Sequence, residues 1–91
     1  MPTNEEIKSE IINVFTLMIK ALVDNPYEVK VTYWAGDKTT VYEINVDSSD
    51  LGRVIGKKGA IIGSLRTLLV AISSKYKHRS ILELIEKERD K

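Results

Sequence analysis

The chain has 91 residues, of which 43% are hydrophobic and 30% are charged, which suits one compact domain over residues 1–91. It has no cysteine and a single histidine, so disulfides, thiol chemistry and most metal sites are excluded, and we expect no metal, no cofactor and no enzymatic activity. No apolar run approaches the roughly 20 residues of a membrane helix, and the acidic N-terminus lacks a signal pattern, so we expect a soluble cytoplasmic protein without membrane contact.

The charges are distributed unevenly along the chain. Residues 1–50 carry nine acidic and four basic side chains, whereas residues 51–82 carry seven basic side chains and no acidic one. Such asymmetry favours contact between one face of the protein and an anionic polymer. The alternative is a basic helix face that is simply solvated.

The first predicted element is a helix that begins after Thr3. Thr3 and Glu6 have the spacing of a capping box, in which a hydroxyl and a carboxylate satisfy the free amides of a helix N-terminus. The sequence Asp-Asn-Pro at residues 24–26 ends the helix, because proline disfavours a helical residue before it. Apolar residues recur at spacings of three and four, which places them on one side of the helix: Ile7, Ile11, Val14, Phe15, Met18, Ile19 and Leu22.

A pair of strands is predicted after this helix. Residues 29–33 alternate between apolar and polar side chains, as in a half-buried strand, and residues 39–46 are rich in β-branched and aromatic residues. Residues 35–38, Ala-Gly-Asp-Lys, predict a hairpin turn between them. For Trp34 we favour packing or contact between two copies over stacking on a nucleic-acid base. Three tyrosines are expected to pack in the strands, Tyr27, Tyr33 and Tyr42.

Two helices separated by a glycine-containing tip are predicted next. The first begins near Ser49, where Asp47 and Asp50 are expected to start it. The second covers about residues 60–76, and its internal Gly63 predicts close packing against a neighbouring segment. The apolar side of the second helix consists of Ile61, Ile62, Leu65, Leu68, Leu69 and Ile72.

The last element is ambiguous, since residues 81–86 fit a helix or a strand by periodicity alone. We favour a strand through about Ile85, which gives a folded core over about residues 5–86 and a polar tail over residues 87–91. The predicted order is α-β-β-α-α-β, in the α+β class.

The tip itself, Gly56-Lys57-Lys58-Gly59, has the chemistry of a phosphate-binding turn. Glycine has no Cβ, so the backbone can approach a ligand closely and adopt positive φ, while the lysines and the amides that open the next helix attract an anion. No Gly-Lys-Ser or Gly-Lys-Thr closes the motif, which excludes a Walker-type loop. The spacing to Gly63 also differs from a dinucleotide-binding fingerprint.

A longer stretch around the tip points to a known family. Residues 54–62, Val-Ile-Gly-Lys-Lys-Gly-Ala-Ile-Ile, match the pattern Val-Ile-Gly-x-x-Gly-x-x-Ile at every fixed position. In this order of elements, the match resembles the KH RNA-binding domain in its type II arrangement. Residues 49–59 and Arg66-Thr67, together with residues 21–26, more closely resemble the small bacterial single-KH proteins called KhpA, over about residues 7–86.

The resemblance implies a three-stranded sheet with the helices packed on one face. About four nucleotides of single-stranded RNA, or sometimes DNA, would lie in a groove between the tip and the sheet edge. Gly56 and Gly59 would let the backbone approach the phosphates, and Lys57 and Lys58 would supply charge. Val54, Ile55 and Ile62 would form the apolar floor or the core beneath it, with Ile44 and Val46 as weaker candidates for contact with bases.

The remaining basic residues have two interpretations each. Arg53 precedes the tip by one helical turn, where it either reaches a phosphate or is solvent-exposed. Arg66 projects beside the groove or, as we slightly favour, is simply exposed. Four residues at the far end of the second long helix are expected to complement its dipole or to be exposed, Lys75, Lys77, His78 and Arg79.

The leading functional hypothesis is a non-catalytic RNA-binding protein, such as a bacterial RNA chaperone or regulator. The alternative implied by the KhpA resemblance is a protein-interaction subunit that forms a homodimer, or pairs with a larger Jag-like RNA-binding partner in the control of cell elongation and division. Apolar residues that exceed the needs of one small sheet permit such pairing, among them Leu65, Leu69 and Ile72.

Overall fold

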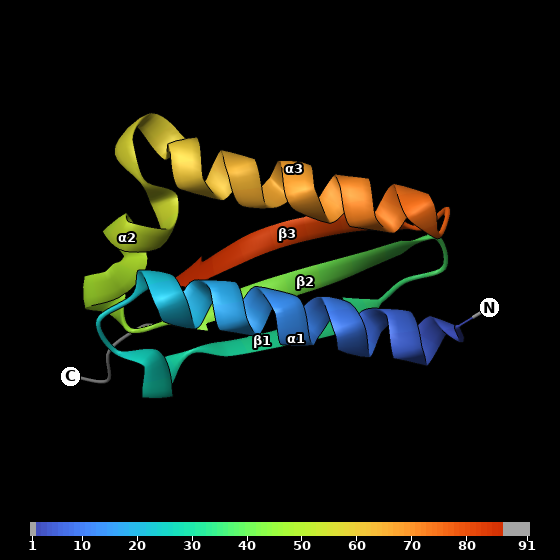
Figure 1. Cartoon of the computed structure of the whole chain (residues 1–91), viewed down its shortest axis with the longest axis horizontal. Helices are drawn as coiled ribbons and strands as arrows, with labels where there is room; N and C mark the ends of the chain where they lie inside the picture. Colours follow the sequence, from blue (N-terminus) through green and yellow to red (C-terminus); the bar gives the residue numbers. More distant parts are fainter. Residues whose placement is uncertain (1, 87–91) are drawn as a thin grey trace.

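The structure, a computed structural model, describes residues 2–86 and has the predicted order of helices and strands (Figure 1). The α+β prediction is therefore confirmed, including a final strand where periodicity left a choice, and the predicted tail over residues 87–91 lies outside the described residues. The elements are α1 (Asn4–Leu22), β1 (Lys30–Ala35), β2 (Thr39–Val46), α2 (Leu51–Ile55), α3 (Ala60–Lys75) and β3 (Arg79–Glu86). Short 3-10 turns cover Pro26–Glu28, Ser48–Asp50 and Lys57–Gly59.

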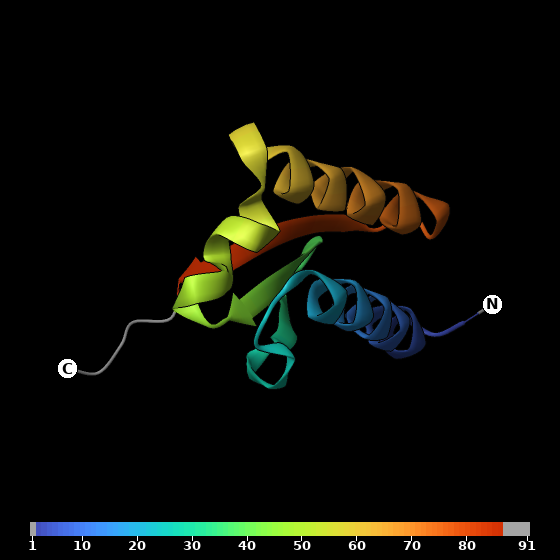
Figure 2. The ribbon, with the colours of Figure 1, turned by 60° about the vertical axis from the view of Figure 1, so that its left-hand side comes forward.

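The three strands form one sheet in the order β1-β2-β3, and α1 and α3 lie on the same face of it (Figures 1 and 2). β1 and β2 pair antiparallel through the hairpin, whereas β2 and β3 pair parallel. A parallel neighbour needs a long crossover, and residues 47–78 supply it. The crossover places α2 and the tip at the end of the sheet where β2 ends, and α3 returns along the sheet to the start of β3 (Figure 1).

The N-terminal end of α1 is capped as predicted. The Thr3 hydroxyl accepts a hydrogen bond from the Glu6 amide at 3.1 Å, and the Glu6 carboxylate accepts one from the Thr3 amide at 3.3 Å. The predicted apolar side of the helix faces the sheet, where Phe15 and Ile19 are fully buried. The centre of the core consists of Ile11, Phe15, Ile19, Tyr42, Ile44, Val54 and Leu69.

The tyrosines and Trp34 differ in their environments. Tyr42 is buried in the core, and burial raises its pKa to about 12. Tyr33 packs against the core and its hydroxyl donates to the Glu5 carboxylate at 3.0 Å. Tyr27 is 99% exposed, so its predicted packing is wrong: the strand begins at Lys30, and Tyr27 lies in the preceding 3-10 turn.

The sheet face away from the helices carries an apolar row that spans all three strands. Trp34, Val41 and Ile81 are partners in the strand register, and Val41 is buried between two half-exposed neighbours. Trp34 is 54% exposed, so its packing or its contact with a second copy stays a prediction. The adjacent row places Glu43 beside Glu83, whereas Lys30 and Arg79 lie on the same face by strand alternation.

The Gly63 prediction is also wrong. A Cβ built on Gly63 would have no other atom within 4 Å outside its own helix backbone and chain neighbours. Its side of α3 therefore faces open space instead of a closely packed segment.

We expect the Phe15→Ala variant to lose about 3–5 kcal/mol of unfolding free energy, because it opens a cavity beneath α1. The neighbouring Leu17 is an exposed residue on the same helix, so Leu17→Ala should change stability by no more than about 0.5 kcal/mol. Chemical denaturation followed by circular dichroism measures both. Equal losses for the two variants would contradict the assigned packing face.

Candidate nucleic-acid interface

The tip is a tight turn built from unusual backbone conformations. Gly56, Lys58 and Gly59 have positive φ angles of 77°, 56° and 75°. The Gly59 amide donates to the Gly56 carbonyl oxygen at 3.1 Å, which closes the turn immediately before α3. Gly59 has no side chain that could cap α3, so the N-terminal end of this helix is open to an anion.

The two glycines are required for different reasons. Gly56 has φ 77° and ψ 173°, a conformation open essentially to glycine alone. A Cβ at this position would also lie 2.6 Å from Cγ1 of Ile61. At Gly59 a Cβ would meet no atom within 4 Å, so only the left-handed conformation favours glycine there.

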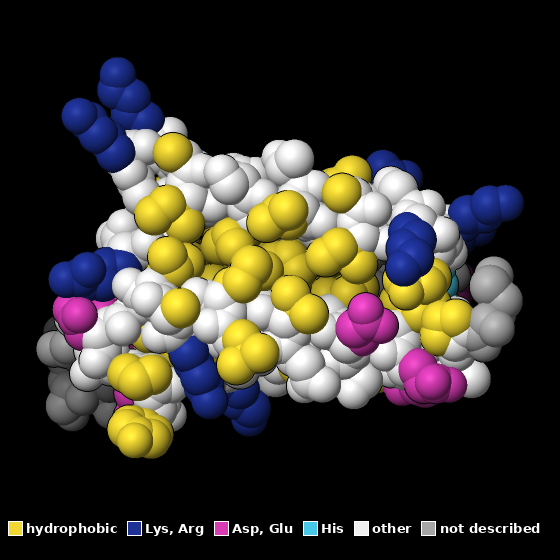
Figure 3. Space-filling model, in the orientation of Figure 1, with side chains coloured by type: hydrophobic (Ala, Val, Ile, Leu, Met, Phe, Trp, Pro, Cys, Tyr) yellow, Lys and Arg dark blue, Asp and Glu magenta, His cyan; other side chains and the backbone are white. Residues whose placement is uncertain are grey.

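Both tip lysines are solvent-exposed. Within residues 2–86, the ion pairs are Lys8–Glu5 and Arg53–Asp24, so neither Lys57 nor Lys58 is neutralised by an acid of the described chain. Figure 3 shows basic side chains projecting beyond the body of the protein at the end where Figure 1 places the turn between α2 and α3. Their charge is thus available to a phosphate group.

The apolar residues predicted around the tip do not share one environment. Val54 is completely buried and Ile62 nearly so, which places both in the core beneath the tip. Ile55 is 40% exposed and could contact a ligand. Ile44 and Val46 are also core residues, so the expectation that they contact bases is wrong.

Arg66 extends from α3 toward the edge strand of the sheet. It is exposed, and its Nε donates a hydrogen bond to the Leu82 carbonyl oxygen of β3 at 3.3 Å. This contact holds the guanidinium group between the helix and the sheet edge. The side chain is therefore both exposed and positioned at the edge where a groove was expected.

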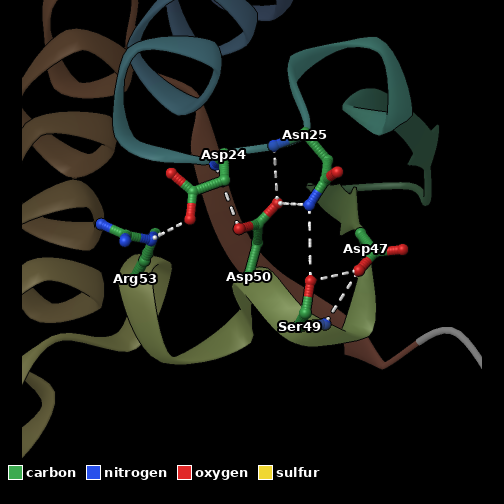
Figure 4. Close-up of polar contacts among 6 residues, drawn as sticks. All are labelled: Asp24, Asn25, Asp47, Ser49, Asp50 and Arg53. Carbon is green, nitrogen blue, oxygen red and sulfur yellow. Dashed lines mark hydrogen bonds and ion pairs between the residues drawn. The ribbon is translucent and has the colours of Figure 1, made fainter.

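Arg53, in contrast, is directed toward the end of α1. Its Nε lies 3.0 Å from the Asp24 carboxylate, and both side chains are more than half exposed (Figure 4). An exposed pair of this kind contributes little to stability. Arg53 is thus solvent-exposed, in agreement with one of its two sequence interpretations, and has an anionic partner in Asp24, while its contact with a phosphate stays a prediction.

The four residues at the far end of α3 form a separate group. α3 has 16 residues, so its ends are about 24 Å apart at 1.5 Å per residue. Lys75 lies over the ring of Tyr76, and the His78 ring is hydrogen-bonded to Asn4. The basic segment of the sequence is therefore divided in space between the two ends of one helix.

A buried carboxylate joins the end of α1 to the start of α2 (Figure 4). Asp50 is 1% exposed and accepts hydrogen bonds from the Asp24 amide at 3.1 Å and from the Asn25 amide and side chain at 3.0 Å each. Burial alone would raise the pKa of the Asp50 carboxyl, but these hydrogen bonds outweigh it and lower the pKa.

This joint was not predicted. Asp47 does act as expected, because its carboxylate accepts hydrogen bonds from the Ser49 amide and hydroxyl. Asp50 makes no side-chain cap of α2. Its carboxylate instead accepts hydrogen bonds from Asp24 and Asn25, which precede it in the chain by 26 and 25 positions. Local spacing contains no signal for a contact at that separation.

The order α-β-β-α-α-β, with a Gly-x-x-Gly turn between two helices on one side of a three-stranded sheet, defines a KH domain. A family model described as "KhpA/KhpB, KH domain" matches residues 13–84. The chain therefore belongs to this KH-domain family, which is non-enzymatic, and the family resemblance noted in the sequence is confirmed.

Three bacterial relatives, each named RNA-binding protein KhpA, illustrate the similarity. The Aquifex aeolicus protein is 46% identical over 78 residues, which cover 86% of this chain and 99% of that protein. The Chlamydia pneumoniae protein is 42% identical over 71 residues, or 78% of this chain and 91% of that protein. The Borreliella burgdorferi protein is 39% identical over 75 residues, or 82% and 92%. No solved structure matched the chain.

Residues 2–86 have neither a candidate metal site nor a candidate membrane span. This part of the chain contains no cluster of three or more histidine, cysteine, aspartate or glutamate residues that could hold a metal ion. Its helices are too short or too polar for any of them to span a bilayer.

We expect Gly56→Ala to destabilise the protein more than Gly59→Ala. At Gly59 a left-handed alanine costs about 1–2 kcal/mol. Gly56 has a backbone conformation open essentially to glycine alone, and Gly56→Ala adds the steric conflict with Ile61. Thermal unfolding of the two variants at one protein concentration measures the difference. Equal losses would contradict this ranking of the two glycines.

Proposed function

We propose that this protein binds short single-stranded segments of RNA without altering them, and that the Gly56–Gly59 tip contacts the RNA backbone. The observation that carries this proposal is the tip itself: a turn with positive φ angles and two lysines that have no acidic partner within residues 2–86, in a chain of the KhpA/KhpB family. The names of the relatives support RNA as the ligand. A role as a cytoplasmic RNA chaperone or regulator follows from such non-catalytic binding.

The proposed contacts follow from the chemistry of each group. Phosphates of about four nucleotides approach the glycine backbone and the open end of α3, and Lys57 and Lys58 supply positive charge. Ile55 offers apolar contact to a base, and Arg66 marks the boundary of the site at the edge of β3. Gly52 is exposed on α2 and has no side chain, which leaves room for the RNA strand beside the tip.

The location of the charges favours the tip over the open sheet surface as the RNA site. Many RNA-binding domains stack bases on aromatic residues of an exposed sheet. Here the open face pairs Glu43 with Glu83 next to its apolar row, and its basic residues Lys30 and Arg79 lie at the strand ends, so positive charge is not gathered on this face as it is at the tip. RNA approaching from the tip avoids the two glutamates.

We expect the double variant Lys57→Asp with Lys58→Asp to lose RNA binding and to keep its fold, because both side chains are exposed. Fluorescence anisotropy with short single-stranded RNA measures the affinity. If the wild-type protein neutralises about three phosphates, log affinity should fall with log salt concentration at a slope of roughly −2.

The matched control is Lys38→Asp with Lys77→Asp, which makes the same change in charge at two exposed lysines at the opposite end of the sheet, in the β1–β2 hairpin and between α3 and β3. This control should retain most of the affinity at moderate salt. Loss of binding in both double variants would indicate a non-specific charge effect, and wild-type affinity in the tip variant would exclude the tip as the RNA site.

The second proposed function is self-association through the helical face. Of the three apolar residues named for such pairing, Leu69 is buried in the core and Ile72 is partly buried, so neither forms this surface, and Leu65 is 4% exposed and reaches it only as part of a groove wall. An apolar groove of about 450 Å³ nevertheless opens between α1 and α3, and Figure 3 shows the hydrophobic band along it. Its walls are formed by Met18, Ala21, Leu22, Ala60, Ile61, Ser64 and Leu65.

A second copy of the chain is the proposed occupant of this groove. A two-fold dimer requires only one self-complementary patch, and this is the commonest arrangement of soluble oligomers. A larger Jag-like KH protein that presents a similar face is the competing occupant.

We expect Ala21→Arg to abolish self-association, because it introduces a long charged side chain into the groove. Light scattering over a concentration series measures the change in mass. Val70→Arg is the control, since Val70 is exposed and lines a different hollow on α3. A wild-type protein that stays monomeric at high concentration would exclude the homodimer.

A further inference from the structure

We infer that Asp50 is a positioning residue for the tip: its carboxylate joins the end of α1 to the start of α2 and thereby fixes the orientation in which the tip meets its ligand. The RNA-binding part of this inference rests on the proposed function. The structural part concerns the free protein and can be tested without RNA.

The geometry of the joint carries the inference. Asp50 Oδ1 accepts from the Asp24 amide, and Oδ2 accepts from both the amide and the side-chain Nδ2 of Asn25 (Figure 4). These three hydrogen bonds measure 3.0–3.1 Å and involve a side chain that is almost completely buried. A buried carboxylate with three donors holds the two segments at one separation and one angle.

The surrounding contacts strengthen the same joint. Asn25 Nδ2 also lies 3.4 Å from the Ser49 hydroxyl, and Arg53 reaches Asp24 from one turn further along α2. The end of α1 therefore contacts the segment before α2 and α2 itself. Both contacts lie on one side of the short helix (Figure 4).

The position of the tip depends on this short helix. α2 has five residues and ends at Ile55, directly before Gly56. The Gly56 amide donates to the Gly52 carbonyl oxygen at 2.9 Å, so the first residue of the tip is bonded to α2. A helix this short has little stability of its own, and its orientation must come from tertiary contacts, namely Val54 in the core and the Asp50 joint.

The joint depends on both acceptor oxygens of the Asp50 carboxylate more than on the size of the side chain. Asparagine has nearly the same size, but its amide would present a donor where Oδ2 now faces two donors from Asn25. Asp50→Asn therefore breaks part of the joint with a minimal change in volume. This makes it a sharper test than removal of the whole side chain.

The first experiment compares RNA affinity in folded proteins. We expect Asp50→Asn to weaken binding of short single-stranded RNA about 10-fold after correction for the folded fraction, and to make the salt slope shallower by about 0.7, which corresponds to one lost phosphate contact. Ile11→Val is the control: it destabilises the core under α1, away from the joint, and should leave both the corrected affinity and the slope unchanged.

A compensating variant separates positioning from a general loss of stability. The double variant Asn25→Asp with Asp50→Asn exchanges carboxylate and amide: the amide at position 50 can donate to the carboxylate at position 25, while one backbone N–H of residues 24 and 25 loses its acceptor, so the recovery is partial. We expect this double variant to bind RNA at least threefold more tightly than Asp50→Asn alone. Failure to recover, together with an affinity loss in the Ile11→Val control, would overturn the inference in favour of simple destabilisation.

The second experiment needs no ligand. Amide NMR resonances of Gly56 and Gly59 report the conformation of the tip in the free protein, and we expect Asp50→Asn to shift or broaden both while Ile11→Val leaves them unchanged. Unchanged glycine resonances in Asp50→Asn would overturn the inference. A wild-type protein that fails to bind RNA would overturn the proposed function, and the resonances would still decide the role of Asp50.

Discussion

Parallel pairing of β3 with β2 is the constraint on which the rest of the structure depends. Antiparallel neighbours can be joined by a short turn, as β1 and β2 are, but a parallel neighbour requires the chain to return to the opposite end of the sheet. The returning segment contains α2, the tip and α3. It places the tip at the end of the sheet where β2 ends, and it places α3 beside α1 on the same face. The apolar core and the exposed turn are therefore consequences of one topological choice.

Local patterns in the sequence were sufficient for most of the fold. The capping box at Thr3, the two periodicities and the Gly-x-x-Gly match predicted the elements and the tip, because each depends on residues close together in the chain. Features that depend on distant segments were missed. Tyr27 was placed in a strand that begins three residues later. Asp50 was interpreted as the start of a helix, because neither its contact with the segment after α1 nor the burial of its carboxylate leaves a periodic pattern in the sequence.

The structure also changes the meaning of the basic segment. Seven basic residues without an acid suggested one continuous cationic face, but α3 separates the residues near its start from those at its far end. In addition, Asp24, from the acidic segment of residues 1–50, pairs with Arg53. Charge that is contiguous in sequence is therefore not contiguous in space. Within residues 2–86 only Lys8 and Arg53 form ion pairs, so the tip differs from other basic positions by carrying two adjacent exposed lysines on one small turn.

Ile61 has a double position, because its side chain lies under Gly56 and also forms part of the wall of the groove between α1 and α3. The turn and the groove thus share one side chain, so a change at position 61 affects both. A smaller residue at position 61 would widen the groove and remove the support of Gly56, whereas a larger one would press on the turn. Evolution of the two surfaces is consequently coupled: a sequence that adjusts one surface through this residue has to accept, or compensate for, the change in the other.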